Sequence, residues 1–366
     1  MRRQPRLSVL APAVAGVVTA AAAAALLAAW RFAFVYRRRA GFPARRPPLE
    51  SPATYGLAFE DVAIASPAGP LPGWFIPAPA PTLEPATAAE GAGTATGAPA
   101  VVLVHGWESN RARMLPNARF LHAAGFHTLM FDVRGHGENP PETLPITAAE
   151  FGADAAAAAR LAAARPDVRS VGIFGHSMGA AGAALAAATE QRIGAVVLTS
   201  TPADPYTLTR RTFELAGLRI PPQIAGPLAR LTLRVFLRPR RHSVADVSAS
   251  SAVRRIAAPI LLIHGRRDEV VPVANLPALA AVADARPSGS VTETLELGEG
   301  YHRWMFEIDE YRTAISSFFA RHLAGAQESS WAEARALATP VRRQADTAGT
   351  FTALEPPVSG RATGEV

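Results

Sequence analysis

Short apolar segments alternate with alanine-rich segments of helical character between residues 47 and 323, and this alternation predicts the fold. Apolar, β-branched runs bounded by Gly, Pro or polar residues are typical of strands. We expect eight of them, at residues 57–64, 73–76, 101–105, 127–132, 168–174, 193–200, 258–264 and 290–297, the first two forming a hairpin. Strands that alternate with helices build a mostly parallel sheet with helices on both faces. The predicted class is therefore α/β.

The N-terminal segment has a different pattern, because Leu7 to Trp30 are 24 consecutive uncharged and mostly apolar residues. A helix of this length can cross a hydrocarbon core of about 30 Å. We interpret residues 1–46 as a single-pass membrane anchor with basic flanks. A cleaved signal peptide is the alternative, although the apolar stretch is longer than the usual signal-peptide core. More arginines follow the span than precede it, which predicts that the rest of the chain lies on the cytoplasmic side.

Three further segments depart from the strand and helix alternation. Residues 78–99 are rich in Pro, Ala, Thr and Gly without apolar periodicity, and we expect a flexible insert there. The tail at 324–366 is expected to be disordered, because it has few apolar residues to bury. Residues 201–255 show helical spacing of leucines and arginines and are expected to form a helical insertion over the sheet.

The net charge of +7 is unevenly placed, which changes what it implies about partners. Residues 1–46 hold nine arginines and no acid, so the rest of the chain has a net charge of −2. We therefore expect no nucleic-acid partner. Within the rest, residues 201–255 hold ten arginines against three acids. This basic insertion is either a solvated helical face or a surface that contacts anionic lipid headgroups.

The residue types present also limit the chemistry. The chain has no cysteine, which excludes disulfides, cysteine nucleophiles and zinc–thiolate sites. It has no H-E-x-x-H motif, no glycine-rich nucleotide motif after a strand and no P-loop. We expect neither a metal nor a cofactor.

The clearest chemical motif is Gly175-His176-Ser177-Met178-Gly179, which lies between an apolar run and an alanine-rich helical segment. A serine on a sharp strand-to-helix turn, flanked by small residues, is raised above the sheet as a nucleophile. We therefore predict that Ser177 is a catalytic nucleophile.

A nucleophilic serine needs a histidine base and a carboxylate that orients the base, and in α/β-hydrolases these follow in the order Ser, Asp or Glu, His. Asp268 and His302 each come shortly after a predicted strand and are the expected partners of Ser177. Glu299 is the alternative acid, and His322 lies too far into a helical segment to fit the role of base.

An oxyanion formed at Ser177 also needs backbone donors. The backbone N–H of Met178 follows the nucleophile directly, and that of Trp107 follows the strand at 101–105. We expect these two N–H groups to form the oxyanion hole. His105 and the turn that contains Asp132, Arg134 and His136 are expected to be structural.

With these motifs in order, the chain resembles the α/β-hydrolase family over roughly residues 55–323. Val102 to Gly106, Asp132 to Gly137, and His264-Gly265 with Asp268 and Val271-Pro272 are similar to motifs of its serine aminopeptidase-like and monoacylglycerol lipase-like branch. The resemblance implies a hydrolase domain over residues 47–323 in which the insertion at 201–255 is a cap over the active site.

Together these features predict a membrane-anchored serine hydrolase that cleaves carboxylic esters through an acyl-enzyme. The anchor places it among membrane lipids, so we expect lipophilic acyl esters as small-molecule substrates. A peptidase or amidase on the same triad remains open, as does a catalytically inactive scaffold on this fold.

Overall fold

The computed structural model describes residues 7–79, 97–287 and 290–324. It contains one eight-stranded sheet in the order β1-β2-β4-β3-β5-β6-β7-β8. The strands are β1 (Glu60–Ser66), β2 (Gly69–Ile76), β3 (Ala98–Val104), β4 (His127–Phe131), β5 (Val168–His176), β6 (Ile193–Thr199), β7 (Ile260–Gly265) and β8 (Thr292–Leu297). β2 pairs antiparallel with β1 and β4, and the other neighbours are parallel. The predicted mostly parallel sheet of eight strands is confirmed.

The expected insert at 78–99 ends earlier than its composition indicated. Ala98 already belongs to β3, where it pairs with Val168 and its N–H donates to the carbonyl of Asp167. Pairing with a neighbouring strand has overridden the weak strand propensity of alanine. Most of the insert and the tail from residue 325 lie outside the described residues.

Helices cover both faces of the sheet, as predicted. α2 (Leu115–Ala123) and α9 (Asp309–Phe319) pack on one face, whereas α3 (Ala148–Ala163), α4 (Met178–Ala187), α7 (Ala249–Val253) and α8 (Asn275–Asp284) pack on the other. The sheet has a hydrophobic core on each face, and the strands contribute to both cores because successive side chains point to opposite faces. In β3, Val102 and Val104 join the core under α3 and α4, whereas Val101 and Leu103 join the core under α2 and α9.

The described residues also contain six short helical segments. They are the 3-10 helices η1 (Pro52–Tyr55), η2 (Arg111–Met114), η3 (Arg238–Arg240), η4 (Ala245–Val247) and η5 (Met305–Glu307), and the π-helical turn η6 (Ala320–Ala324).

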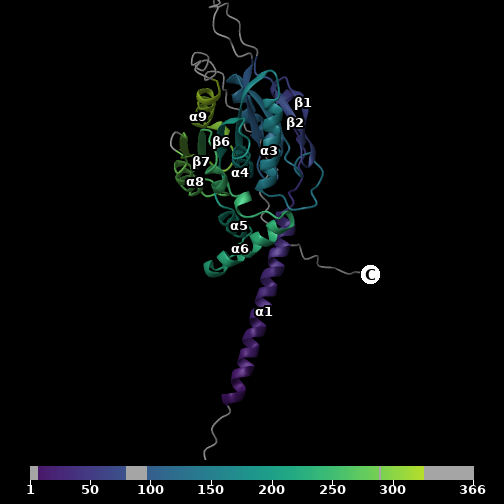
Figure 1. Cartoon of the computed structure of the whole chain (residues 1–366), viewed down its shortest axis with the longest axis vertical. Coiled ribbons are helices and arrows are strands. Elements are labelled where there is room, and N and C mark those ends of the chain that lie inside the picture. The colour runs from purple at the N-terminus through teal and green to yellow at the C-terminus, as the bar shows by residue number, and fades with distance from the viewer. Residues whose placement is uncertain (1–6, 80–96, 288–289, 325–366) are drawn as a thin grey trace, which may run out of the picture.

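The expected helical insertion is present and consists mainly of two helices. α5 (Pro205–Leu215) and α6 (Pro222–Leu237) project from one end of the body, which is the sheet with the helices on its two faces (Figure 1). α7, although it lies inside residues 201–255, packs against α4 and α8 and so belongs to the body. From here on, the cap means α5 and α6.

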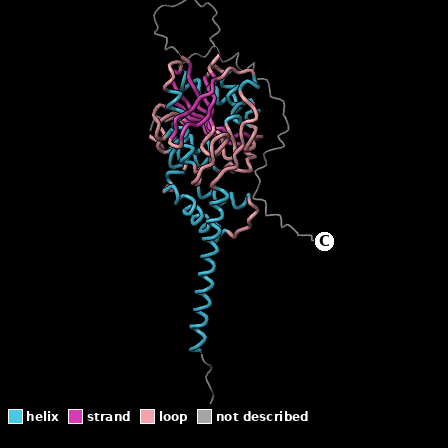
Figure 2. Tube along the Cα trace, turned by 90° about the vertical axis from the view of Figure 1, so that its right-hand side faces the viewer, coloured by secondary structure: helices cyan, strands magenta, loops and turns pink. Residues whose placement is uncertain are grey.

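The N-terminal helix α1 (Leu7–Ala40) extends away from the body at the same end as the cap (Figures 1 and 2). Its segment Val14–Ala40 contains an 18-residue stretch with a mean hydropathy of 1.8 and is long and apolar enough to cross a membrane, a test that a signal sequence also passes. Apolar side chains such as Val17 and Leu26 are 69% and 71% exposed. Such exposure leaves a large apolar surface on this part of α1, which is costly in water.

The last turns of α1, in contrast, pack against the cap. Phe32 and Tyr36 contact the ring of Phe213 in α5 edge to face, at centroid distances of 5.4 and 5.5 Å. Tyr36 also lies 6.5 Å from the ring of Phe236 in α6, and Ala33 is fully buried. The helix is therefore longer than the predicted apolar span, and its final turns are part of the folded domain.

Candidate active site

The strand order places a candidate site between β3 and β5. From β3 the chain crosses to β4 on one side, and it then returns to β5 on the other side of β3. The loops after β3 and β5 therefore leave in opposite directions and open a crevice at the carboxyl ends of these strands, where open α/β sheets bind ligands. Ser177 follows β5 and Trp107 follows β3, so both lie at this crevice.

Ser177 occupies the sharp turn between β5 and α4. Its backbone has φ 56° and ψ −122°, a conformation that non-glycine residues rarely adopt and that costs free energy. The turn fits only because the flanking residues are glycines. A Cβ on Gly175 would lie 2.4 Å from the carbonyl oxygen of Gly179, and one on Gly179 would lie 2.3 Å from the carbonyl oxygens of Val104 and His105. The geometry is that of the predicted nucleophile turn.

Asp268 and His302 come together from two different loops. Asp268 follows β7 and His302 follows β8, and His302 Nδ1 lies 2.8 Å from Asp268 Oδ2. The other carboxylate oxygen accepts the backbone N–H groups of Val270 and Val271 at 2.9 and 2.7 Å. The acid is therefore held in one orientation, and the hydrogen bond fixes the ring of His302.

The environment of Asp268 keeps it ionised. Burial acts to raise its pKa, but hydrogen bonds from His264 and His302 outweigh burial and hold the pKa of this carboxyl well below its usual range. His264 Nε2 lies 3.5 Å from Asp268 Oδ2 and 2.8 Å from the carbonyl of Val271. The carboxylate thus lies between two histidines, and only His302 was predicted to contact it.

A histidine beside Ser177 lies between the serine turn and the pair of Asp268 and His302. His176, the residue before Ser177, lies with its ring centroid 4.9 Å from that of His302. Burial lowers the pKa of His176 to about 3, so this ring is neutral. No hydrogen bond joins Ser177 Oγ to His302 within the described residues. His302 is nevertheless packed against the turn that carries Ser177.

Two backbone donors lie beside Ser177. A Cβ on Gly106 would lie 3.4 Å from Ser177 Cβ, so the loop between β3 and Trp107 lies against the serine turn. The backbone N–H groups of Trp107 and Met178 have no hydrogen-bond acceptor in the described part of the chain. Both are available to an oxyanion at this position.

His105 holds the loop that carries Trp107. Its Nδ1–H donates to the carbonyl of Gly106 at 2.8 Å, and its Nε2 accepts the backbone N–H of Val133 at 3.0 Å. Burial lowers its pKa to about 4, which keeps the ring neutral and able to make both contacts. The structural role expected of His105 agrees with this geometry.

The turn after β4 is also held by ion pairs. Asp132 accepts from the backbone and guanidinium of Arg111, and Arg134 pairs with the buried carboxylate of Asp154. The ring of His136 packs edge to face against Trp107 at 5.2 Å. The turn therefore supports the wall of the site, as expected of a structural element.

The remaining candidates lie elsewhere. Glu299 pairs with Arg267 on the surface, 2.8 Å away, and makes no contact with His302 in the described residues. His322, in η6, packs its ring on Phe318 at 4.7 Å. Among the described residues, no group of three or more His, Cys, Asp or Glu side chains is arranged to hold a metal ion.

The segment after α1 contributes a contact that the sequence did not indicate. The backbone N–H of Ala44 donates to Glu108 Oε1, and Asn110 Nδ2 donates to the carbonyl of Arg46 at 2.9 Å. The N–H of Ile146 donates to the carbonyl of Gly41 at 2.8 Å. Residues 41–46 therefore run along the loops at the carboxyl ends of the strands.

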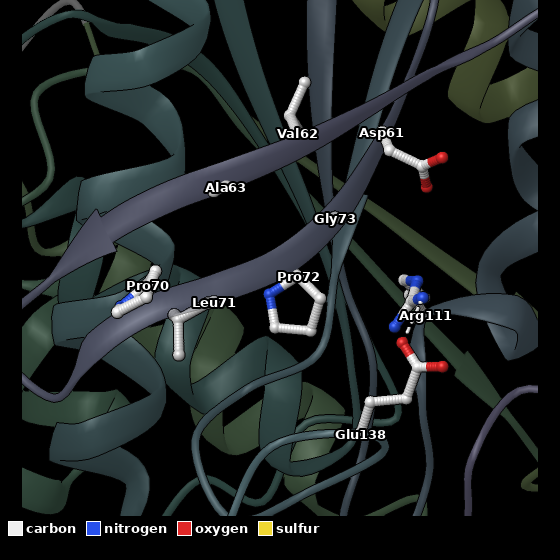
Figure 3. A pocket seen from close by; sticks show the side chains of 9 residues that line it. All are labelled: Asp61, Val62, Ala63, Pro70, Leu71, Pro72, Gly73, Arg111 and Glu138. Carbon is white, nitrogen blue, oxygen red and sulfur yellow. Dashed lines mark hydrogen bonds and ion pairs between the residues drawn. The ribbon is translucent and has the colours of Figure 1, made fainter.

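A groove of about 400 Å³ lies outside this site, along the β1–β2 hairpin. Figure 3 shows Arg111 and Glu138 paired at one side of it and Pro70, Leu71 and Pro72 along the strand. The Arg111 guanidinium is already neutralised by Asp132 and Glu138. Ser177, Asp268 and His302 do not line this groove.

Comparison with known proteins shows what this arrangement is similar to. Residues 97–238 match the family model described as serine aminopeptidase, S33. An uncharacterised protein of Mycobacterium tuberculosis is 30% identical over 285 residues, which cover 77% of this chain and 83% of that protein. The structure of an esterase from Pyrococcus furiosus aligns with a TM-score of 0.57 at 22% identity, covering 77% of this chain and 97% of the esterase. An acylaminoacyl peptidase from Pyrococcus horikoshii aligns with a TM-score of 0.51 at 15% identity, covering 74% of this chain and 43% of the peptidase.

Proposed function

Because the chain belongs to the α/β-hydrolase family, we propose that it is a membrane-anchored serine hydrolase that cleaves carboxylic esters. The proposed catalytic residues are Ser177, His302 and Asp268, with the backbone N–H groups of Trp107 and Met178 as the oxyanion hole. The observation that carries the proposal is the 2.8 Å hydrogen bond between His302 and Asp268, beside a serine on a strained strand-to-helix turn.

The chemistry would proceed in two steps. Ser177 Oγ attacks the ester carbonyl while His302 Nε2 takes the hydroxyl proton. The oxyanion accepts hydrogen bonds from Met178 and Trp107. When the intermediate collapses, His302 gives the proton to the departing alkoxide, leaving an acyl-Ser177. Water, deprotonated by His302, then releases the carboxylic acid and restores the serine.

Asp268 has two tasks in this scheme. Its hydrogen bond to Nδ1 keeps the proton on that nitrogen, so that Nε2 is free to act as base. Its negative charge also stabilises the imidazolium that forms when His302 takes the proton from Ser177.

We assign lipophilic acyl esters as the substrate class from the position of α1. Its final turns pack on the cap, and residues 41–46 follow the loops beside the oxyanion donors. An enzyme whose active-site end adjoins its membrane span meets substrates that partition into the bilayer. We further propose that this domain lies on the cytoplasmic side, because arginines are more numerous after the span than before it.

The side of the membrane has a direct test. The chain has no cysteine, and Leu49 is 97% exposed just after α1. A Leu49→Cys variant in intact cells should resist a membrane-impermeant maleimide and react after lysis. Labelling of intact cells would place the domain outside the cytoplasm.

Amide hydrolysis is the second candidate function, because the matching family model is described as serine aminopeptidase. The same triad can act on either bond, and the acyl-enzyme chemistry is shared. Release of p-nitroaniline from aminoacyl p-nitroanilides, at rates above those on esters, would favour this function.

The deciding experiment is hydrolysis of p-nitrophenyl esters, from acetate to palmitate, by the full chain in detergent. Ser177→Ala is the test variant and Ser66→Ala, in the β1–β2 hairpin away from the site, is the matched control. We expect turnover that is lost only in Ser177→Ala. Folded protein that turns over neither esters nor anilides would support the inactive scaffold instead.

A further inference from the structure

Three arginines form a line along the exposed side of α6. Arg230 and Arg234 lie four residues apart within the helix, and Arg238 follows at its C-cap with the same spacing, so all three share one face. All three side chains are exposed. The sequence from Leu215 to Ala245 contains no acid at all.

None of these three arginines has a carboxylate partner in the described part of the chain. Two nearby arginines, Arg211 in α5 and Arg240 in η3, do. Arg211 pairs with Glu214 at 2.8 Å, and Arg240 pairs with Glu142 and donates to the carbonyl of Pro145. Arg240 therefore joins the C-terminal end of the cap to the body, whereas the charges of the three arginines on α6 have no carboxylate partner in the residues that the structure describes.

The line lies where a bilayer surface would be. α6 crosses α1 where α1 meets the body (Figure 1), and the two helices touch through Tyr36 and Phe236. In α1, the charged Arg31 ends the uncharged segment only five residues before Tyr36. The end of the hydrocarbon core thus lies about one and a half helical turns from the contact with α6.

The other end of the cap exposes apolar side chains. Leu218, in the turn before α6, is 38% exposed, and Ile224, in its first turn, is 56% exposed. Exposed apolar residues that adjoin a basic helical face are typical of helices that lie in a membrane interface.

We propose that the exposed face of α6, defined by Arg230, Arg234 and Arg238, docks on anionic phospholipid headgroups of the membrane that α1 enters. Guanidinium groups bind phosphate oxygens in bidentate fashion, which favours arginine for this contact. Docking holds the cap at a fixed height above the bilayer, with the active-site end of the body turned to the lipid surface. The inference rests on the membrane anchoring in the proposed function but not on the catalytic chemistry.

A single fluorescent reporter can test this docking, because the chain has no cysteine. Gln223 is exposed and lies on the same face as Arg230 and Arg234, seven and eleven residues before them. The full chain with Gln223→Cys, labelled with an environment-sensitive dye, is reconstituted in nanodiscs of phosphatidylcholine with or without phosphatidylglycerol. A Gln191→Cys reporter, in the exposed turn after α4, serves as the control for position.

We expect the dye at residue 223, but not at residue 191, to become brighter and blue-shifted when phosphatidylglycerol is present. The triple variant Arg230→Gln, Arg234→Gln, Arg238→Gln should lose this response. Each arginine near an anionic surface favours the docked state about fivefold, so three of them amount to roughly 100-fold. The control variant Arg192→Gln, Arg254→Gln, Arg321→Gln removes the same charge from exposed positions outside the cap and should keep the response.

Two results would overturn the inference. One is a signal at residue 223 that does not depend on lipid charge, which would make the arginines a solvated face. The other is failure of the full chain to enter nanodiscs, which would remove the anchoring on which the inference depends. Labelling of Ser177 by a fluorophosphonate in the same samples separates either result from a failure of the proposed catalytic chemistry.

Discussion

His302 Nδ1 lies 2.8 Å from Asp268 Oδ2, and in the proposed mechanism this contact leaves Nε2 as the nitrogen that acts on Ser177. The carboxylate is itself fixed by the backbone N–H groups of Val270 and Val271. The loop after β7 therefore fixes the position of His302, the proposed base, after β8.

Replacing the acid tests this relationship. Asp268→Asn keeps the side-chain shape but no longer stabilises the protonated ring, so we expect kcat for p-nitrophenyl esters to fall about 10³- to 10⁴-fold. Glu299→Gln is the matched control, because Glu299 pairs with Arg267 at the surface and should leave kcat within about twofold. Equal losses in the two variants would mean that Asp268 is not the orienting acid.

The serine turn should tolerate no side chain at Gly179. A Cβ there would lie 2.3 Å from two backbone carbonyl oxygens, so Gly179→Ala should lower the free energy of unfolding by about 3 kcal/mol, the upper end for overpacking, and abolish activity. Gly226→Ala in α6 is the control. Apart from its chain neighbours and the backbone of its own helix, no atom lies within 4 Å of its Cβ position, so this change should be neutral or stabilising by up to about 1 kcal/mol. Similar effects of the two substitutions would contradict the packing described for the turn.

The final turns of α1 should be needed for cap stability. A chain that begins at Arg31 retains Phe32, Ala33 and Tyr36, whereas one that begins at Pro47 uncovers Phe213. We expect the shorter chain to unfold several degrees lower, since about 1 kcal/mol corresponds to roughly 2–4 °C in a domain of this size. It should also bind more of a hydrophobic dye. Equal melting temperatures in thermal scans would show that α1 adds nothing to the folded domain.

Stability should fall as the pH drops below about 6.5. Burial lowers the pKa of His105 to about 4 and that of His136 to about 3, whereas an unfolded histidine titrates near 6.5. The unfolded chain therefore binds protons first, and the stabilisation is complete above pH 6.5 and is lost as the pH falls towards 4.

The expected slope between pH 6 and 5 is roughly 1.4 kcal/mol per pH unit for each of these two histidines. Urea unfolding of the chain that begins at Arg31 measures it. The depressed pKa of Asp268 acts in a separate window, below pH 4, because the stability it contributes is lost only as that carboxylate protonates. A flat profile between pH 7 and 5 would show that the two rings are not buried in the neutral form.

The strands and the serine turn could be predicted because their signals are local. Apolar runs of strand length are contiguous in the sequence, and the glycines of the serine turn lie within two residues of Ser177. In the structure these runs form the strands, and the turn has no room for a Cβ at Gly175 or Gly179. Asp268 and His302 each follow a strand, so the sequence also predicted that they lie at the carboxyl ends of the strands, because parallel strands present these ends together.

What the sequence did not indicate depends on tertiary contacts. His176, the last residue of β5, contacts the ring of the proposed base His302, and no spacing rule links these two residues. His264, in β7, lies only four residues before the proposed acid Asp268, but the sequence alone does not show that the turn between them brings its ring to the carboxylate. The apolar pattern predicted a span that ends at Trp30. The helix continues to Ala40, and in these added turns Ala33 is buried and the rings of Phe32 and Tyr36 pack on the cap. Tertiary packing set the boundary, and composition could not reveal it.

Labelling with a fluorophosphonate, followed by mass analysis of the modified peptide, tests the central claim most directly. We predict one adduct per chain, on Ser177. It should form in the full chain, form more slowly in the Asp268→Asn variant, and be absent from the Ser177→Ala variant although that variant folds. Adduct formation on another residue, or none on Ser177 in folded protein, would contradict the assignment of Ser177 as the nucleophile.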